Sequence, residues 1–145
     1  MKVNYKKQAP YILGAGLLLY LIFGSKKNSN QDTADQIDTE AEAAESQGLP
    51  LSYPLSNYFL FADTLQSAMF DLGTNESKIY AIFNKLNNAR DLLQLIKSFG
   101  LRPYYQFGWN QGNYNLGQWF GEELSITEYN KINQILQDKG INYQF

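Results

Sequence analysis

A stretch of roughly eighteen residues near the N-terminus, from Gln8 to Ser25, carries no charged side chain. Its central part reads PYILGAGLLLYLIF and is apolar on every face of a helix rather than along one stripe. At a rise of ~1.5 Å per residue, this helix would be ~27 Å long, which suffices to cross a thin bilayer. The sequence therefore predicts that residues 1–27 form a single-pass membrane anchor.

Lysine residues flank the stretch on both sides and tyrosine residues stand near its ends, as expected at the two interfaces of a bilayer. The lysine distribution slightly favours an N-terminus on the inner side of the membrane, with the remainder of the chain across it. A cleaved signal peptide is the alternative, although no clear small-residue cleavage site follows Phe23. The side chains predicted to anchor the chain in the bilayer are Tyr11, Leu17, Leu18, Leu19, Tyr20 and Phe23.

The next segment, residues 28–48, contains six acidic residues, no basic residue and only one large aliphatic side chain, Ile37. Such a composition cannot bury enough apolar surface to offset the entropy lost on ordering. We expect a flexible tether whose typical end-to-end distance is ~25 Å. Residues 49–145 then form the one globular domain, and their apolar content is sufficient for a core.

The chain contains no cysteine and no histidine, which excludes disulfides, thiolate or imidazole metal sites and histidine-based catalysis. The net charge is −2, and the basic residues of the domain are scattered among acidic ones, so nucleic acid is not an expected partner. Glu122 and Glu123 are adjacent carboxylates, but neighbouring side chains on a helix diverge and cannot flank one bond as a catalytic pair does. The sequence therefore favours a protein that is not an enzyme.

Capping signals divide the domain into helices. Ser56 and Asn57 are expected to open a helix that runs to Phe70, and Thr74 is expected to cap the next one. Asn88 caps a third helix, which Gly100 ends.

A short fourth helix is expected over residues 116–124, with Trp119 and Phe120 turned inward. Ser125 and Glu128 form a capping box that opens the last helix, and the apolar tail at 141–145 is expected either to cover its own bundle or to dock on a partner. No alternating strand pattern of useful length competes with these helices. The predicted fold class is all-α, a small bundle of four to five helices.

Between the third and fourth helices, residues 101–115 contain proline, glycine and many aromatic side chains, and we expect an aromatic loop. Its rings could stack on sugars, anchor an interface, or pack over the bundle. The predicted interaction residues are Tyr104, Tyr105, Phe107, Trp109 and Tyr114.

The segment Leu-Gly-Thr-Asn-Glu at 72–76, the helical hairpin after it and the Glu-Glu-Leu-Ser of 122–125 resemble one annexin-type repeat. The resemblance covers roughly residues 71–140 and implies an annexin-repeat-like bundle. It also implies calcium as a cofactor, with the carbonyl oxygen of Gly73 and the carboxylate of Glu123 as ligands, and oxygen ligands suit calcium. The alternative is that Gly73 ends a helix and Thr74 caps the next, with no metal involved.

Single repeats of this size are also similar to small proteins of bacteriophages and their hosts, which implies a virion component. The first functional hypothesis is accordingly a single-pass protein of a virion internal membrane or a bacterial inner membrane, which links the bilayer to a protein assembly such as a capsid shell. The second hypothesis is a cell-envelope module that binds glycan or calcium-bridged lipid. An enzyme such as a peptidoglycan lyase is the least favoured, and a homo-oligomer is compatible with each hypothesis.

Overall fold

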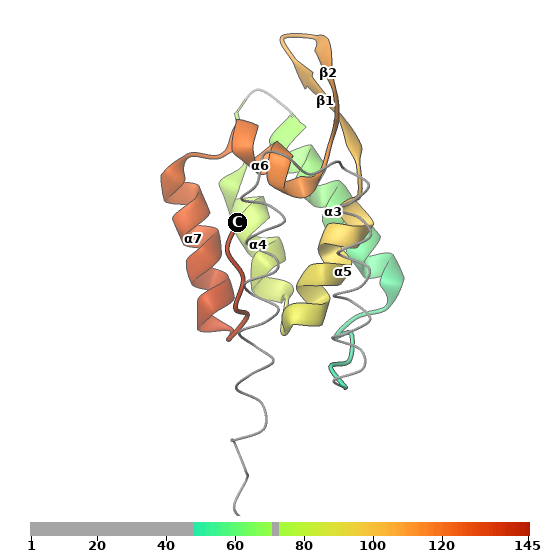
Figure 1. Cartoon of the computed structure of the whole chain (residues 1–145), viewed down its shortest axis with the longest axis vertical. Helices are drawn as coiled ribbons and strands as arrows, with labels where there is room; N and C mark the ends of the chain where they lie inside the picture. The colour runs from blue at the N-terminus through green and yellow to red at the C-terminus, as the bar shows by residue number, and fades with distance from the viewer. Residues whose placement is uncertain (1–47, 71–72) are drawn as a thin grey trace, which may run out of the picture.

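Five helices and one β-hairpin make up the described part of the chain, residues 48–70 and 73–145, in a computed structural model (Figure 1). In chain order the elements are α3 (Leu55–Phe70), α4 (Glu76–Lys85), α5 (Ala89–Phe99), β1 (Arg102–Gln106), β2 (Trp109–Tyr114), α6 (Leu116–Glu123) and α7 (Ile126–Asp138). The predicted anchor and almost all of the predicted tether lie outside these residues. Within the described ranges, no helix is long and apolar enough to span a bilayer.

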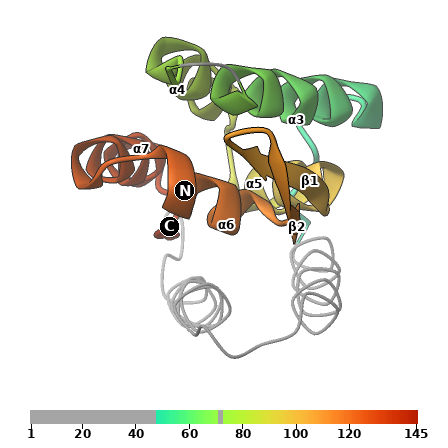
Figure 2. The same cartoon turned by 90° about the horizontal axis from the view of Figure 1, so that it is seen from above.

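The helices form two layers. Figure 2 shows α3 and α4 side by side in one layer and α5, α6 and α7 in the other, and α3 contacts both α4 and α5 while α4 contacts α7. The core between the layers is built from the largest fully buried side chains, which include Tyr58, Leu65, Phe83, Leu92, Trp119 and Phe120. The prediction of an all-α bundle is therefore confirmed in part, because the described residues form a mostly helical domain that also contains a small hairpin.

Most of the predicted helix ends are confirmed. The Asn88 side chain accepts a hydrogen bond from the backbone N–H of Asp91 at 3.1 Å, and Gly100 ends α5 with a φ of 59°. The capping box opens α7, where the backbone N–H of Ser125 donates to the carboxylate of Glu128.

Two helix starts differ from prediction. Asn75, not Thr74, caps α4, because its side-chain oxygen accepts from the backbone N–H of Lys78 at 3.0 Å. The first helix begins at Leu55, directly after Pro54, rather than behind a Ser56 or Asn57 cap. The first N–H groups of a helix have no intrahelical acceptor, and here the backbone N–H of Asn57 donates to the carbonyl oxygen of Pro54 at 3.0 Å.

The C-terminal tail packs on its own domain. Ile141 and Tyr143 are buried, and the Phe145 ring meets the rings of Phe83 and Phe120 at 5.5 and 4.9 Å. The expectation that the tail covers its own bundle is therefore confirmed.

The prediction of an aromatic loop without strands at 101–115 is wrong. Residues 102–114 form an antiparallel hairpin whose register pairs Tyr105 with Asn110 and Gln106 with Trp109. A bulge between Tyr104 and Tyr105 shifts the register, so aromatic and polar residues do not alternate along the sequence as they do in a regular strand. The turn pair Phe107-Gly108 is also not one of the Asn-Gly or Asp-Gly pairs that mark a hairpin.

The segment that enters the domain is held by a buried carboxylate. Asp91 has no exposed surface and accepts hydrogen bonds from the Tyr58 hydroxyl and from two backbone N–H groups, those of Ser52 at 2.9 Å and Asn87 at 2.8 Å. One side chain on α5 thereby joins the entry segment, α3 and the α4–α5 turn. The sequence indicates only the position of Asp91 in the first turn of a helix.

Burial by itself raises the pKa of Asp91, but the hydrogen bonds from Tyr58, Ser52 and Asn87 lower the pKa by more than burial raises it. The pKa of this carboxyl therefore lies below its ordinary value. A carboxyl with a lowered folded-state pKa stabilises the fold fully above its unfolded-state pKa of about 3.9. Its contribution is lost as the pH falls through the lower, folded-state pKa.

We predict that Asp91→Asn lowers the free energy of unfolding by about 2–4 kcal/mol at pH 7, because the amide cannot accept from all three donors. The measurement is urea denaturation followed by circular dichroism. The difference from wild type should shrink at acidic pH, where the wild-type carboxyl is protonated. Asp63→Asn, at an exposed ion pair, is the control and should cost less than about 1 kcal/mol. Equal effects of both variants would contradict this role for Asp91.

Candidate functional site

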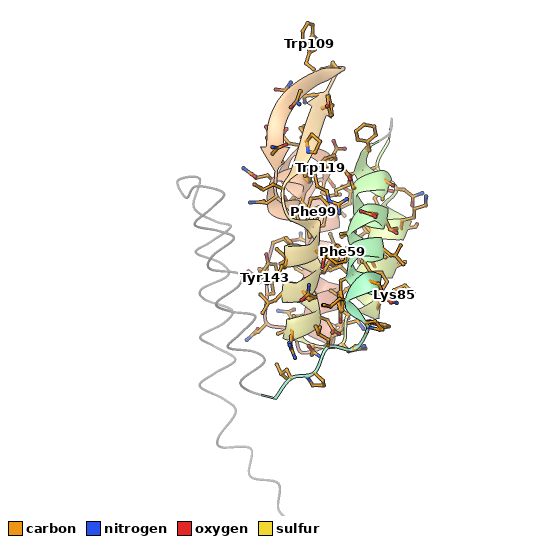
Figure 3. All side chains as sticks on the ribbon, turned by 90° about the vertical axis from the view of Figure 1, so that its right-hand side faces the viewer. Phe59, Lys85, Phe99, Trp109, Trp119 and Tyr143 are labelled. Atoms are coloured by element: carbon orange, nitrogen blue, oxygen red, sulfur yellow. The ribbon has the colours of Figure 1, made fainter. Side chains whose placement is uncertain are left out.

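The β-hairpin projects from one end of the domain, opposite to the end at which the chain enters from Gly48 (Figures 1 and 3). The five predicted interaction residues divide along its length. At the base, the rings of Tyr104 and Tyr114 stack at 5.0 Å, and Tyr104 meets Trp119 edge-on at 4.9 Å. These two tyrosines therefore join the hairpin to the core rather than offering a free surface.

The tip of the hairpin is exposed. Phe107 exposes 94% and Trp109 exposes 76% of its surface, and Figure 3 shows Trp109 at the far end of the hairpin. Tyr105 lies between base and tip, half-exposed, with its ring 6.3 Å from that of Phe70 on α3. Of the predicted interaction residues, Phe107, Trp109 and part of Tyr105 are thus accessible to a partner.

The turn at the tip has an unusual residue in it. Phe107 and Gly108 are the two residues between the paired strands, and both have positive φ, 51° and 82°. This is the pattern of a type I′ turn, in which asparagine or glycine is the favoured first residue. A phenylalanine there is strained by roughly 1–2 kcal/mol, and its exposed ring recovers none of that cost within the domain.

The base of the hairpin is fixed by Arg102. Its guanidinium donates to Asp63 at 2.9 Å and to Gln66 at 2.7 Å, both on α3, and lies 4.8 Å from the centre of the Phe99 ring on α5. Beyond this arginine no charged residue occurs until Glu122. The hairpin is therefore an uncharged projection on a rigid base.

The outer face of α3 is a second exposed apolar surface, which sequence reasoning missed. Its inner face is buried, yet four apolar residues on the outside remain half-exposed or more, with Leu60 at 63%. Asp63 is the one charged residue of this helix, and Arg102 already pairs with it. We call this surface the α3 face; its exposed apolar residues are Leu55, Phe59, Leu60 and Phe70.

The α3 face had a readable signal. The helix sequence LSNYFLFADTLQSAMF places large apolar residues on its outer side as well as on its inner side, where they stand among six polar residues. In the described residues only the inner side is covered.

The two positions implied by the annexin resemblance come close together. The Thr74 hydroxyl, next to Gly73, donates to the Glu123 carboxylate at 3.2 Å across 49 positions of sequence. The Tyr104 hydroxyl donates to the other carboxylate oxygen at 2.7 Å. The pKa of Tyr104 is raised above its ordinary value, mainly by burial and secondly by this hydrogen bond to Glu123.

As a calcium site, this arrangement is incomplete. Calcium takes about 6–8 oxygen ligands, usually several of them charged, whereas both oxygens of Glu123 already accept from hydroxyl groups. Residues 48–70 and 73–145 contain no group of three or more acidic, histidine or cysteine side chains placed to hold a metal ion. Gly73 has a φ of 95°, which fits the alternative in which it helps to end a helix, although Asn75 rather than Thr74 caps the next one.

Comparison with known proteins gives no family for the chain: no protein-family model, no curated protein and no solved structure matches it. The anchor residues predicted at 11–23 lie outside the described ranges. Among the described residues, the candidate site consists of the hairpin tip and the α3 face.

We predict that Glu123→Gln lowers the free energy of unfolding by about 1–2 kcal/mol, because two hydroxyl donors lose a charged acceptor. Glu122→Gln, the exposed neighbour on the same helix, is the matched control and should change it by less than about 0.5 kcal/mol. Chemical denaturation with and without added calcium measures both effects. A stabilisation of wild type by calcium that Glu123→Gln removes would instead establish the metal site that the resemblance implies.

Proposed function

We propose that this chain is a non-enzymatic, single-pass membrane protein that holds a lipid bilayer next to a larger protein assembly. The observation that carries the proposal is the α3 face. Four large apolar side chains remain half-exposed or more on a helix with one charge, and exposed apolar surface of this extent is a feature of protein contacts. The lipid connection rests on the charge-free stretch at 8–25 of the sequence.

The energies suit an adaptor. Covering the exposed half of Phe59 or Leu60 contributes about 1 kcal/mol each, so the α3 face supplies only a modest affinity. Membrane attachment raises the effective concentration at a nearby partner, which makes a modest contact sufficient. The acidic segment at 28–48 lets the domain reach that partner at a distance from the headgroups.

The assembly that we propose is the protein shell of a lipid-containing bacteriophage, in which the bilayer lies inside the shell. An annexin-repeat-like arrangement of the helices is part of this proposal. The contact between Thr74 and Glu123 supports it, because the loop and the carboxylate that the resemblance pairs are neighbours.

A second candidate is a cell-envelope module that recognises glycan. The observation in its favour is the exposed ring of Trp109, since flat aromatic side chains stack on sugar rings. Loss of oligosaccharide binding in Trp109→Ala, with unchanged helicity, would favour this candidate over the adaptor.

We predict that a benzophenone amino acid in place of Leu60 forms a cross-link to a shell or scaffold protein in intact particles or membranes. The same amino acid in place of Gln137, exposed on α7, is the control and should give no such product. Leu60→Glu in a chain that carries the benzophenone in place of Phe59 should abolish the cross-link, because it buries a charge in the contact. A product that joins two copies of this chain would identify a homo-oligomer, and absence of any product from the Leu60 position would contradict the adaptor.

We also predict that deletion of residues 1–27 moves the chain from the membrane fraction to the soluble fraction and leaves its helical circular dichroism unchanged. The buried core of the described residues lies within residues 58–143, outside the deleted segment. Flotation in a sucrose gradient measures the change. Membrane association as strong as that of the full chain would contradict a single anchor at this position.

A further inference from the structure

The hairpin tip combines two costs that the isolated domain does not recover. Phe107 occupies a positive-φ position that favours asparagine or glycine, and it exposes nearly all of its ring. Trp109, two residues on, is also largely exposed. An asparagine at position 107 would relieve the strain and the apolar exposure together, so the phenylalanine is explained by what the tip touches.

The absence of charge at the hairpin tip limits the kinds of partner that the tip can bind. The region between Arg102 and Glu122 contains no charged residue, and Arg102 is already engaged with Asp63 and Gln66. A tip without charges has no electrostatic attraction to a charged partner, whether nucleic acid, acidic peptide or anionic headgroup. It suits a surface that accepts aromatic rings and uncharged amides together.

The shape of the hairpin limits the kinds of partner further. The tip is a projection in which two exposed rings stand at the end of a narrow ribbon, as Figure 3 shows for Trp109. A projection encloses no small ligand, but it can enter a soft surface. Because β1 and β2 pair with each other up to Gln106 and Trp109, the backbone polar groups near the tip are largely satisfied as it enters.

The interface of a lipid bilayer meets these requirements. Tryptophan and tyrosine concentrate at the headgroup level of membranes, where the ring is in an apolar layer and its polar atom remains hydrated. In this hairpin Phe107 and Trp109 are outermost, Tyr105 lies one step behind, and the amides of Gln106, Asn110 and Gln111 flank them. Each level of the hairpin near the tip thus pairs an aromatic ring with an amide, Trp109 with Gln106 and Tyr105 with Asn110.

We propose that the hairpin tip, Phe107 with Trp109, inserts into the headgroup region of a lipid bilayer, independently of calcium and of lipid charge, and gives the domain a second membrane contact. The inference rests on the proposed function only in that the predicted anchor places the domain beside a bilayer. The α3 face takes no part in this contact and remains available to a protein.

The length of the chain before Gly48 allows the tip to reach the bilayer that holds the anchor. The tip is at the end of the domain opposite to Gly48, so the domain must turn over on its tether. A domain of about a hundred residues is roughly 35 Å across, and about 20 residues of extended chain reach ~70 Å. The segment at 28–48 is therefore long enough.

The two tryptophans of the chain provide the test. Trp109 is exposed and Trp119 is buried in the core, so their fluorescence reports separately on the tip and on the fold. The full chain is reconstituted into phosphatidylcholine vesicles, with or without brominated acyl chains that quench nearby tryptophan. We expect brominated lipid to remove at least half of the Trp109 emission, and the Trp109→Phe variant, which retains only Trp119, to show little quenching.

Phe107→Asn is the variant that tests the insertion. It should raise the urea midpoint of the domain, because it relieves the turn, while it reduces the quenching of Trp109 severalfold. Gln137→Asn, a polar change on α7, is the control and should change neither value. Chelation of calcium and addition of anionic lipid should leave the quenching unchanged.

The opposing outcomes are distinct. If the Trp109 emission is insensitive to brominated lipid, the tip does not insert and a protein or glycan is its partner. If quenching requires calcium, the contact is a metal-bridged one and the proposal is wrong. Flotation of the vesicles separately reports the anchor, and the cross-link from position 60 reports the protein contact, so failure of the proposed function is not mistaken for failure of insertion.

Discussion

The hydrogen bonds to Asp91 are the constraint on which the arrangement of the domain depends. A buried carboxylate without partners would be costly, but this one accepts from Tyr58 on α3, from Ser52 in the entry segment and from Asn87 before α5. The entry segment and the start of α3, which lie 39 and 33 positions from Asp91 in sequence, must therefore take fixed positions around one side chain of α5. The direction in which the chain enters the domain, and hence the end from which the hairpin projects, follows from that point.

A second set of contacts, at the base of the hairpin, fixes the position of the hairpin on the helices. Arg102 joins α3 to α5 through Asp63, Gln66 and the carbonyl of Phe99, and Tyr104 packs against Trp119 and donates to Glu123. A two-stranded hairpin alone is marginally stable, so these contacts explain why it keeps a defined direction away from the bundle. The rigid base also means that the exposed tip is presented rather than freely mobile.

Much of the fold could be predicted from local chemistry. Asn88, Gly100 and the Ser125–Glu128 pair are each read correctly because a cap requires a particular side chain at one position next to a helix end. The hairpin could not be read, because a bulge disrupts its alternation and a phenylalanine replaces the usual turn residue. The sequence indicates Asp91 only as a helix-start residue, because two of its three donors, Ser52 and Tyr58, lie 39 and 33 positions away along the chain.

For the candidate site, sequence reasoning picked out five aromatic residues but could not separate the buried ones from the exposed ones. Tyr104 and Tyr114 are as aromatic as Phe107 and Trp109, and only the strand register decides which rings face the core. The α3 face could not be predicted from the sequence for a different reason. An apolar residue such as Phe59 or Leu60 is ordinarily assigned to the core, and only the three-dimensional arrangement leaves these two outside.

The two exposed surfaces share one physical property, the lack of free charge, which explains why they would belong to a tethered domain. Apolar contacts give no long-range attraction, so a partner of this kind is met at unsteered rates and held by modest energies. In the function that we propose, attachment to a membrane compensates by keeping the domain near both the lipid and the assembly. The acidic segment before Gly48 and the uncharged tip both lack basic residues, so burial of the rings at the tip, rather than attraction to anionic headgroups, would hold the domain at a bilayer.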